Sequence, residues 1–331
     1  MPLAAILGVE GTSLNAWERG FLRDADPWGF ILFGRNVADP TQLRRLTAEL
    51  REVVGRDAPI LIDQEGGRVQ RMRAPFWREY LPALTQMALA TDALRAQWVR
   101  NRLIAAELHD VGIDVNCAPL ADLVEDGTHP ILLNRLYGAD IPTVVTAART
   151  CAQAFLAGGV LPVLKHIPGY GRARVDSHKD LPRVSASREA LQSRDFAPFR
   201  ALRDLPMGMT AHIVFEAVDP DRPCTTSPDA IRMIREEIGF DGLLMTDDIG
   251  MEALSGTMAQ RAAASLDAGV DVVLHCKGDR PGMEGTVSAG RPLDGRALER
   301  AVRALALRRP PEPADVPALA EELRGLVPEG A

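Results

Sequence analysis

Short runs of apolar residues recur along the chain, and a longer stretch with helical spacing separates each run from the next. Several runs are almost unbroken, which is typical of strands buried on both faces of a parallel sheet. The expected strands are Ala4–Leu7, Phe30–Phe33, Ile60–Ile62, Ile113–Asn116, Val160–Leu164, Met207–Ala211, Leu243–Met245 and Val272–Leu274.

The stretches between these strands carry the residues that begin and end helices. Asp39 and Ser227 each precede a proline, which suits an N-cap followed by the first helical position. Glycines at positions 55 and 239 are expected to end the same two helices. A third helix is expected from a cap at Thr91 to position 112, and a fourth over residues 141–156.

Eight strand–helix alternations favour an α/β fold built as a single-domain (β/α)8 TIM barrel over an open sheet. The barrel is expected to occupy residues 1–331, because no linker divides the chain. A proline-rich and then helical tail begins at about residue 309, and we expect it to pack on the surface without a catalytic role.

Polar or ionisable residues follow almost every expected strand. In a barrel these strand ends converge on one rim, where active sites are built. The residues are Glu10, Arg35, Asn36, Asp63, Asn116, Lys165, His166, His212, Asp247, Asp248 and His275. Of the two histidines in the later strands, we expect His212 to line the site.

Composition and net charge limit the classes of molecule that the protein is expected to bind. The 331 residues carry a net charge of −7, so neither a nucleic acid nor an anionic membrane is an expected partner. The beginning of the chain has neither a basic leader nor an apolar run long enough to span a bilayer. The four cysteines are scattered, as expected for free thiols. We therefore expect a cytoplasmic monomer that binds a small molecule.

The histidines offer no recognisable metal-binding spacing, so neither a metal nor a cofactor is expected. Lys165 and His166 instead open a glycine- and proline-containing loop that continues to Asp176 and His178. A carboxylate two residues from an imidazole can orient the ring for acid–base catalysis. An ordinary surface pair is the competing interpretation. Schiff-base chemistry at Lys165 has no support from the rest of this loop.

Two further segments offer reactive or binding groups. Asp247 is a candidate nucleophile, whereas Asp248 is expected to cap the next helix. Asp63 and Arg71 flank a paired-glycine segment and offer groups that bind hydroxyls. A phosphate cradle is the alternative there, but neither common glycine-rich phosphate motif occurs.

With these motifs the chain resembles the family 3 glycoside hydrolases, and among them the bacterial cytosolic β-N-acetylglucosaminidases (β-hexosaminidases) of peptidoglycan recycling. The resemblance runs from about Gly29 to Cys276. It rests on the order and spacing of four motifs: Ile31–Asn36, Asp63–Val69, Lys165–Gly171 with Asp176–His178, and Thr246–Asp248.

The resemblance implies a retaining hydrolase in which Asp247 is the nucleophile and His178, assisted by Asp176, is the general acid/base. It also implies a saccharide substrate, GlcNAc-1,6-anhydroMurNAc and its peptides, and no cofactor. The residues implied to bind the terminal sugar are Asp63, Arg71, Arg135, Lys165 and His166.

Three positions depart from the family pattern. Tyr170 stands where a second histidine is common, Ile167 where an aromatic residue is common, and Gly250 where a serine is common. Tyr170 leaves the loop conformation and the aglycone preference open. Two other functions also stay open on the same barrel: a glycoside phosphorylase, and a sugar-binding protein without catalysis.

Overall fold

Eight parallel strands close into a barrel in a computed structural model, which describes residues 1–175 and 180–327. Because β1 pairs with β2 on one side and with β10 on the other, the sheet has no free edge. The predicted TIM barrel is confirmed. Its strands are β1 (Leu3–Gly8), β2 (Pro27–Leu32), β3 (Ile60–Ile62), β4 (Val115–Asn116), β5 (Leu161–Ile167), β7 (Met207–Thr210), β9 (Leu243–Asp248) and β10 (Val272–His275).

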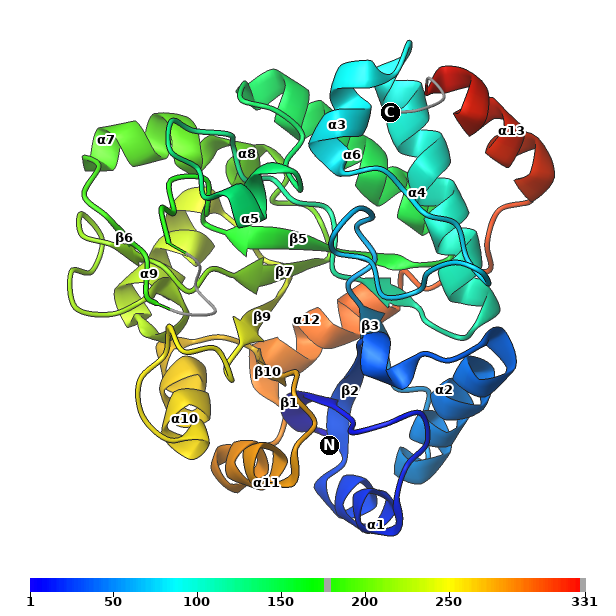
Figure 1. Ribbon diagram of the computed structural model, residues 1–331. Coiled ribbons are helices and arrows are strands. Elements are labelled where there is room, and N and C mark those ends of the chain that lie inside the picture. Colours follow the sequence, from blue (N-terminus) through cyan, green and yellow to red (C-terminus); the bar gives the residue numbers. More distant parts are fainter. Residues whose placement is uncertain (176–179, 328–331) are drawn as a thin grey trace.

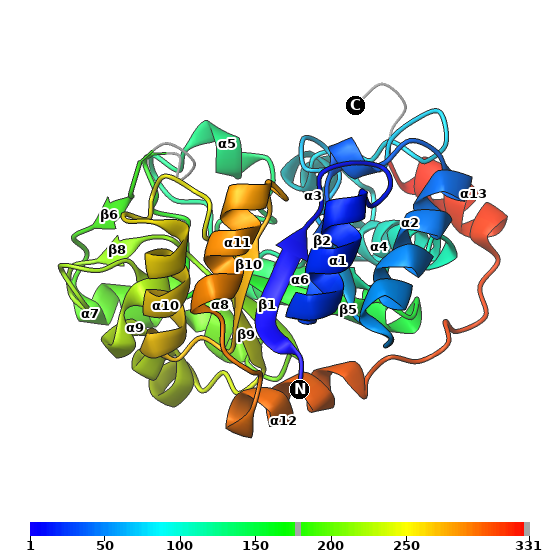
Figure 2. The ribbon, with the colours of Figure 1, turned by 90° about the horizontal axis from the view of Figure 1, so that it is seen from below.

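Helices surround this barrel, and Figure 2 shows α12 across the end where the chain begins, with α5 at the opposite end. Figure 1 looks along the barrel. The α-helices are α1 (Ala16–Ala25), α2 (Pro40–Val54), α3 (Ala83–Leu89), α4 (Ala93–Asp110), α5 (Pro130–Leu133), α6 (Ile141–Ala157), α7 (Arg188–Ala190), α8 (Ala197–Ala201), α9 (Pro228–Met233), α10 (Met258–Ala268), α11 (Arg280–Ala289), α12 (Gly295–Leu305) and α13 (Val316–Leu326).

Short elements complete the ring. Two of them, β6 (Arg183–Val184) and β8 (Val214–Phe215), form a small parallel sheet outside the barrel. The others are single turns of 3₁₀ helix, η1 (Gly34–Asn36) and η3 (Cys224–Thr226), and of π-helix, η2 (Leu191–Asp195) and η4 (Ile234–Ile238).

The helix boundaries follow the capping chemistry closely, with one correction. The Asp39 side chain accepts the backbone N–H of Gln42 at 2.9 Å, and Gly55 ends α2 with a φ of 64°, as predicted. The predicted cap at Thr91 is wrong: the neighbouring Asp92 caps α4, because its carboxylate accepts the N–H of Arg95. The Thr91 hydroxyl instead donates to the Leu326 carbonyl in the tail.

Two of the barrel strands extend further than their apolar runs. β5 continues through Lys165 and His166, and β9 continues through Asp247 and Asp248. Parallel pairing holds them there, since Ile167 pairs with the last residue of β7 and Asp248 pairs with a residue of β10. These strand ends were not predicted, because the strands were located from runs of apolar residues and the side chains here are polar.

The barrel interior and the helix–sheet interface are filled by apolar side chains. Phe30, Ile62, Val163 and Met245 are among the fully or almost fully buried residues of the main cluster. Within residues 1–175 and 180–327, no helix is both long and apolar enough to cross a membrane. The packed core leaves the rim at the strands' C-terminal ends as the place for chemistry.

Candidate active site

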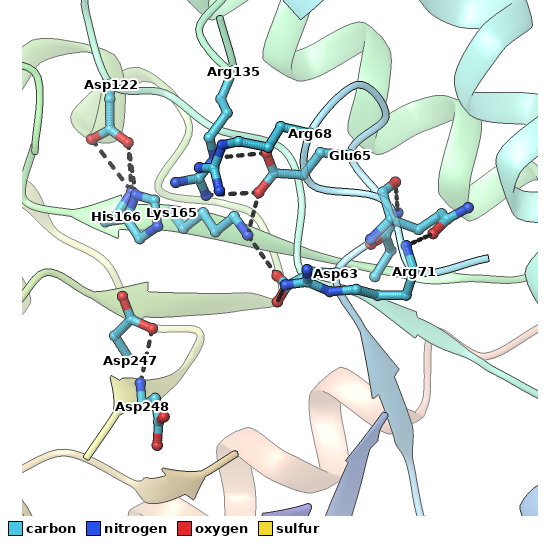
Figure 3. Close-up of polar contacts among 12 residues, drawn as sticks. Asp63, Glu65, Arg68, Arg71, Asp122, Arg135, Lys165, His166, Asp247 and Asp248 are labelled. Carbon is cyan, nitrogen blue, oxygen red and sulfur yellow. Dashed lines mark hydrogen bonds and ion pairs between the residues drawn. The ribbon is translucent and has the colours of Figure 1, made fainter. Parts of the chain in front are cut away.

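Ionisable side chains line a hollow at the C-terminal ends of the strands. Three strand ends contribute Asp63, Lys165, His166 and Asp247, and the loops after β3 and β4 contribute Arg71 and Arg135. Figure 3 shows these side chains pointing toward one another. The barrel therefore gathers six of the sequence-predicted site residues around one hollow.

Five of the charged groups around the hollow form a connected set of ion pairs. The Lys165 ammonium lies 2.9 Å from Asp63 and 2.7 Å from Glu65. The Arg135 guanidinium donates two hydrogen bonds to Glu65, at 2.9 and 2.8 Å. Arg71 contacts the second oxygen of Asp63 at 3.2 Å. Each long cation is thus held in one orientation by a carboxylate.

Burial and partners act in opposite directions on these groups. Burial alone would raise the pKa of the Asp63 and Glu65 carboxyls, but Lys165 and the arginines outweigh it, lowering the pKa of Asp63 far below its usual range and that of Glu65 to about 2. Burial likewise opposes the charge on Lys165, yet its two carboxylates raise its pKa. All three side chains are charged at neutral pH, as hydroxyl-binding groups should be.

Glu65 was not selected from the sequence as a site residue, although it belongs to the Asp63–Val69 motif. Its side chain is only 5% exposed and contacts Lys165 and Arg135. A carboxylate two residues after a strand-end aspartate is the signal that could have identified it, because successive polar residues at a strand end share the same rim.

Asp122 is a second residue that sequence reasoning missed. It lies six residues beyond the end of β4, among apolar neighbours, and its side chain is fully buried. Its carboxylate accepts the backbone N–H of Tyr170 at 2.7 Å and lies 2.8 Å from the His166 Nδ1. A lone carboxylate in an apolar loop is the available signal, since such a group must find partners when buried.

Asp247 projects into the hollow from β9, as the nucleophile hypothesis requires. One of its carboxylate oxygens accepts the backbone N–H of Asp248 at 2.8 Å. Burial would raise the pKa of Asp247, but His166, His212, that N–H and Lys165 lower it further than burial raises it. The carboxylate is therefore ionised, and it faces the same space as the hydroxyl-binding groups.

The expectation that Asp248 caps the next helix is wrong. No helix begins there, since α10 starts ten residues later. One oxygen of Asp248 accepts the N–H of Gly250 at 2.9 Å and that of Cys276 at 3.0 Å. The side chain therefore joins the turn after β9 to the end of β10.

His212 does not line the hollow, contrary to expectation. It is 1% exposed, with Nδ1 2.7 Å from the Thr225 hydroxyl and Nε2 2.9 Å from the Asp248 carbonyl. Burial lowers its pKa despite the nearby aspartates. Both ring nitrogens are therefore occupied, and through the Asp248 carbonyl His212 holds the backbone next to Asp247.

Several other strand-end residues also brace loops. The Asn36 amide donates to the carbonyls of Val9 and Gly11, and Arg35 reaches the Val9 and Cys276 carbonyls. The Asn116 side chain exchanges two hydrogen bonds with the Gln64 backbone. Polar residues at strand ends thus divide into those that line the hollow and those that hold its rim.

Asp176 and His178 lie outside the described residues. The described part of their loop is anchored upstream, because the Thr128 hydroxyl donates to the Gly171 carbonyl at 2.7 Å and His129 donates its N–H to the Ala173 carbonyl. The first part of the loop therefore lies beside the segment that follows β4, at the rim next to the end of β5.

The remainder of the wall combines apolar and charged side chains. Ile31, Phe33, Val69, Met209, Met251, Leu274 and Cys276 supply the apolar or weakly polar part, and Arg68 and Asp248 complete the lining. Polar groups that fix orientation, set beside apolar surface, are typical of small-molecule sites. Among the described residues, no group of three or more His, Cys, Asp or Glu side chains is arranged to hold a metal ion.

Comparison with known proteins gives consistent matches. The profile of the glycosyl hydrolase family 3 N-terminal domain matches residues 7–307. A β-hexosaminidase of Alkalilimnicola ehrlichii is 38% identical over 279 residues, which is 82% of this chain and 80% of that protein. One from Xanthomonas campestris pv. campestris (strain B100) is 36% identical over 301 residues, covering 88% of this chain and 90% of the relative.

Solved structures agree with these matches. NagZ from Neisseria gonorrhoeae, in complex with N-trifluoroacetyl-D-glucosamine, superposes with a TM-score of 0.83 at 30% identity, covering 98% of this chain and 94% of that one. A family 3 β-N-acetylglucosaminidase from Paenibacillus sp. str. FPU-7 gives a TM-score of 0.85 at 27% identity, covering 97% of this chain and 66% of that one.

Proposed function

Because this chain belongs to glycosyl hydrolase family 3, we propose that it removes terminal β-linked N-acetylglucosamine from GlcNAc-1,6-anhydroMurNAc and its peptides. It is a glycoside hydrolase of the β-N-acetylhexosaminidase type. The anhydromuramyl substrate, and with it a role in peptidoglycan recycling, is the specific part of the proposal. We place the reaction in the cytosol, which agrees with four cysteines that are all free thiols.

The observation that carries the proposal is the position of Asp247. An ionised carboxylate faces a hollow whose opposite wall is formed by Asp63, Lys165 and Arg135. Carboxylates and cations that are already paired with one another can bind several sugar hydroxyls at once, and they would hold the anomeric carbon near the nucleophile.

The reaction we propose has two displacements. Asp247 attacks C1 of the sugar, the bond from C1 to the departing oxygen breaks, and His178 donates a proton to that oxygen. Water then attacks C1 of the glycosyl ester, His178 takes its proton, and the Asp247 carboxylate is released. Asp176 orients the His178 ring. The roles of Asp176 and His178 rest on the family resemblance.

Product analysis tests the substrate and the stereochemistry together. The protein is incubated with a GlcNAc-anhydroMurNAc peptide and separately with chitobiose, and products are followed by mass and by proton NMR. We expect free N-acetylglucosamine whose first-formed anomer is β. A first-formed α anomer would contradict the nucleophile, and unaltered substrate would point to sugar binding alone. Sugar 1-phosphate, formed when phosphate is added, would show a phosphorylase.

His178→Ala tests the acid. Removing the proton donor should lower kcat/KM on the natural disaccharide about 100-fold or more, because general acid catalysis contributes on that order. An aryl glucosaminide with a good leaving group should lose much less, since its departing oxygen needs no proton. Equal losses on both substrates would remove His178 from this role.

A further inference from the structure

The buried carboxylate of Asp122 contacts His166 at two places. Oδ2 lies 2.8 Å from the ring Nδ1, and both oxygens lie within 3.4 Å of the His166 backbone nitrogen. Oδ1 also accepts the N–H of Tyr170 at 2.7 Å. Figure 3 shows His166 between Asp122 and Asp247.

This contact decides which nitrogen of the ring carries a proton. An ionised carboxylate can only accept hydrogen bonds, so the His166 Nδ1 must be the donor. The second nitrogen, Nε2, is then the one that the ring offers to the hollow, which His166 lines together with Asp247. The hydrogen bond made by one ring nitrogen sets the role of the other.

We propose that Asp122 is a positioning residue for the hydrolysis: it keeps the His166 Nδ1 protonated and holds the ring so that Nε2 meets the sugar next to Asp247. This inference rests on the proposed function and adds a residue to the same site. Asp122 acts through His166 and does not touch the substrate itself, since its side chain is fully buried.

Asp122 also anchors the loop backbone, and one substitution separates the two roles. In Asp122→Asn the remaining carbonyl oxygen can keep the Tyr170 contact at the Oδ1 position. The new amide group then takes the Oδ2 position and points a donor at His166 Nδ1. The Tyr170 N–H and the His166 backbone N–H can both keep their contacts with the oxygen at the Oδ1 position, at 2.7 and 3.4 Å. The ring, in contrast, must switch to the tautomer with its proton on Nε2.

The first test reads the tautomer directly by NMR of the full-length protein labelled with ¹⁵N-histidine. In the wild-type protein at neutral pH we expect the His166 Nδ1 to carry the ring proton that faces Asp122. In Asp122→Asn that nitrogen should lose its proton. His212 serves as the reference in the same spectra, because its two ring nitrogens bond to Thr225 and Asp248. A wild-type Nδ1 without a proton would overturn the proposal without any variant.

The second test is a double-mutant cycle on kcat/KM. Asp122→Asn should lower kcat/KM roughly 10- to 100-fold, since misplacing a catalytic-site group by about 1 Å costs on that order. In a His166→Ala background the same change should cost less than about twofold, because the two residues act as one unit. Losses that multiply would mean that Asp122 does not act through His166.

Asp271→Asn is the matched control for losing a buried carboxylate. Asp271 is 5% exposed and binds Arg235 and Arg300 at the opposite end of the barrel. The Asp271→Asn substitution should lower the melting temperature. It should leave kcat/KM within about twofold of the wild type, because the Asp271 side chain touches no residue that lines the hollow. If the wild-type protein hydrolyses no glucosaminide, the proposed function fails, but the tautomer measurement still decides the role of Asp122.

Discussion

Asp247 stays ionised although it is partly withdrawn from solvent at the end of β9. Burial alone would raise its pKa, but the surrounding imidazoles, the Asp248 N–H and Lys165 lower it. A carboxylate that is partly desolvated is a better nucleophile than a fully hydrated one. The charges around Asp247 therefore matter as much as its position.

Asp247→Asn tests this directly. The amide fills the same space and can still accept the Asp248 N–H, so the fold should be unchanged. Turnover of an aryl β-N-acetylglucosaminide should fall by at least about 10³-fold, because the step that forms the covalent intermediate is lost. Glu216→Gln, which removes one exposed carboxylate paired with Arg183, is the control. Retention of more than a tenth of the wild-type rate would rule out Asp247 as nucleophile.

Glu65 holds two cations of the hollow, so we expect Glu65→Gln to cost both stability and activity. Removing one partner of a buried pair costs roughly 3–5 kcal/mol, because Lys165 and Arg135 stay buried with less compensation. The pKa of Glu65 is lowered to about 2 in the folded protein, so its contribution is present above about pH 4.5 and lost as the pH falls toward 2.

Calorimetric melting curves between pH 7 and pH 3 measure this contribution. The wild-type melting temperature should fall as the pH drops below 4.5, and the Glu65→Gln variant should fall less steeply over the same interval. Parallel curves for the two proteins would show that Glu65 does not contribute to stability through its charge.

At the scale of elements, the segment between β3 and α3 reaches the hollow only because its backbone can approach other elements closely. Gly66 has a φ of 96°, and a Cβ there would lie 2.0 Å from the guanidinium of Arg100 and 2.9 Å from Tyr80. Arg100 is 1% exposed and donates a hydrogen bond to the Glu65 carbonyl. A buried arginine thus holds the backbone that positions Glu65.

Gly66→Ala and Gly55→Ala form a matched pair of substitutions on this scale. Both glycines have positive φ, but nothing lies within 4 Å of a Cβ at Gly55. Gly55→Ala should cost only the backbone penalty, roughly 1 kcal/mol. Gly66→Ala should cost roughly 3 kcal/mol, because Arg100 must also move, and it should lower kcat/KM. If denaturant unfolding shows that both substitutions lower the free energy of unfolding equally, the contact with Arg100 is unimportant.

At the scale of the whole molecule, the C-terminal tail runs from the barrel end covered by α12 back along one side. α13 packs against α4, and Arg95 binds the Glu322 carboxylate at 2.5 and 2.8 Å. The backbone of Glu312 is held by Ala157 and Arg102. Figure 1 shows α13 at the outer edge of the molecule, beside α4.

A chain that stops after Arg309 tests whether this tail matters only for stability. The residues removed include the partly buried apolar side chains of α13, so we expect a loss of roughly 3 kcal/mol. The values of kcat and KM should stay within about threefold of the wild type at a temperature where both proteins are folded, because the family profile already ends at residue 307. A large rise in KM would show that the tail shapes the sugar site.

Much of the fold could be predicted from the sequence, because the signals for strands and for helix ends depend on residues that are neighbours in the chain. Apolar runs located the barrel strands, and Asp39 and Gly55 marked α2. The errors arose where a contact came from far along the chain. The polar ends of β5 and β9 are strands only because neighbouring strands pair with them, and Asp248 bonds to Cys276 at the end of the adjacent strand β10.

The sequence by itself determined the barrel, the family and most of the residues gathered at the rim, since strand order and motif spacing are properties of the chain. The tertiary structure alone decided which polar residues face the hollow and which brace it. Asp247 and His212 both lie at strand ends, yet only Asp247 reaches the hollow. The direction of a side chain and the partners of a buried charge depend on segments that meet only after folding, as Asp122 and His166 do.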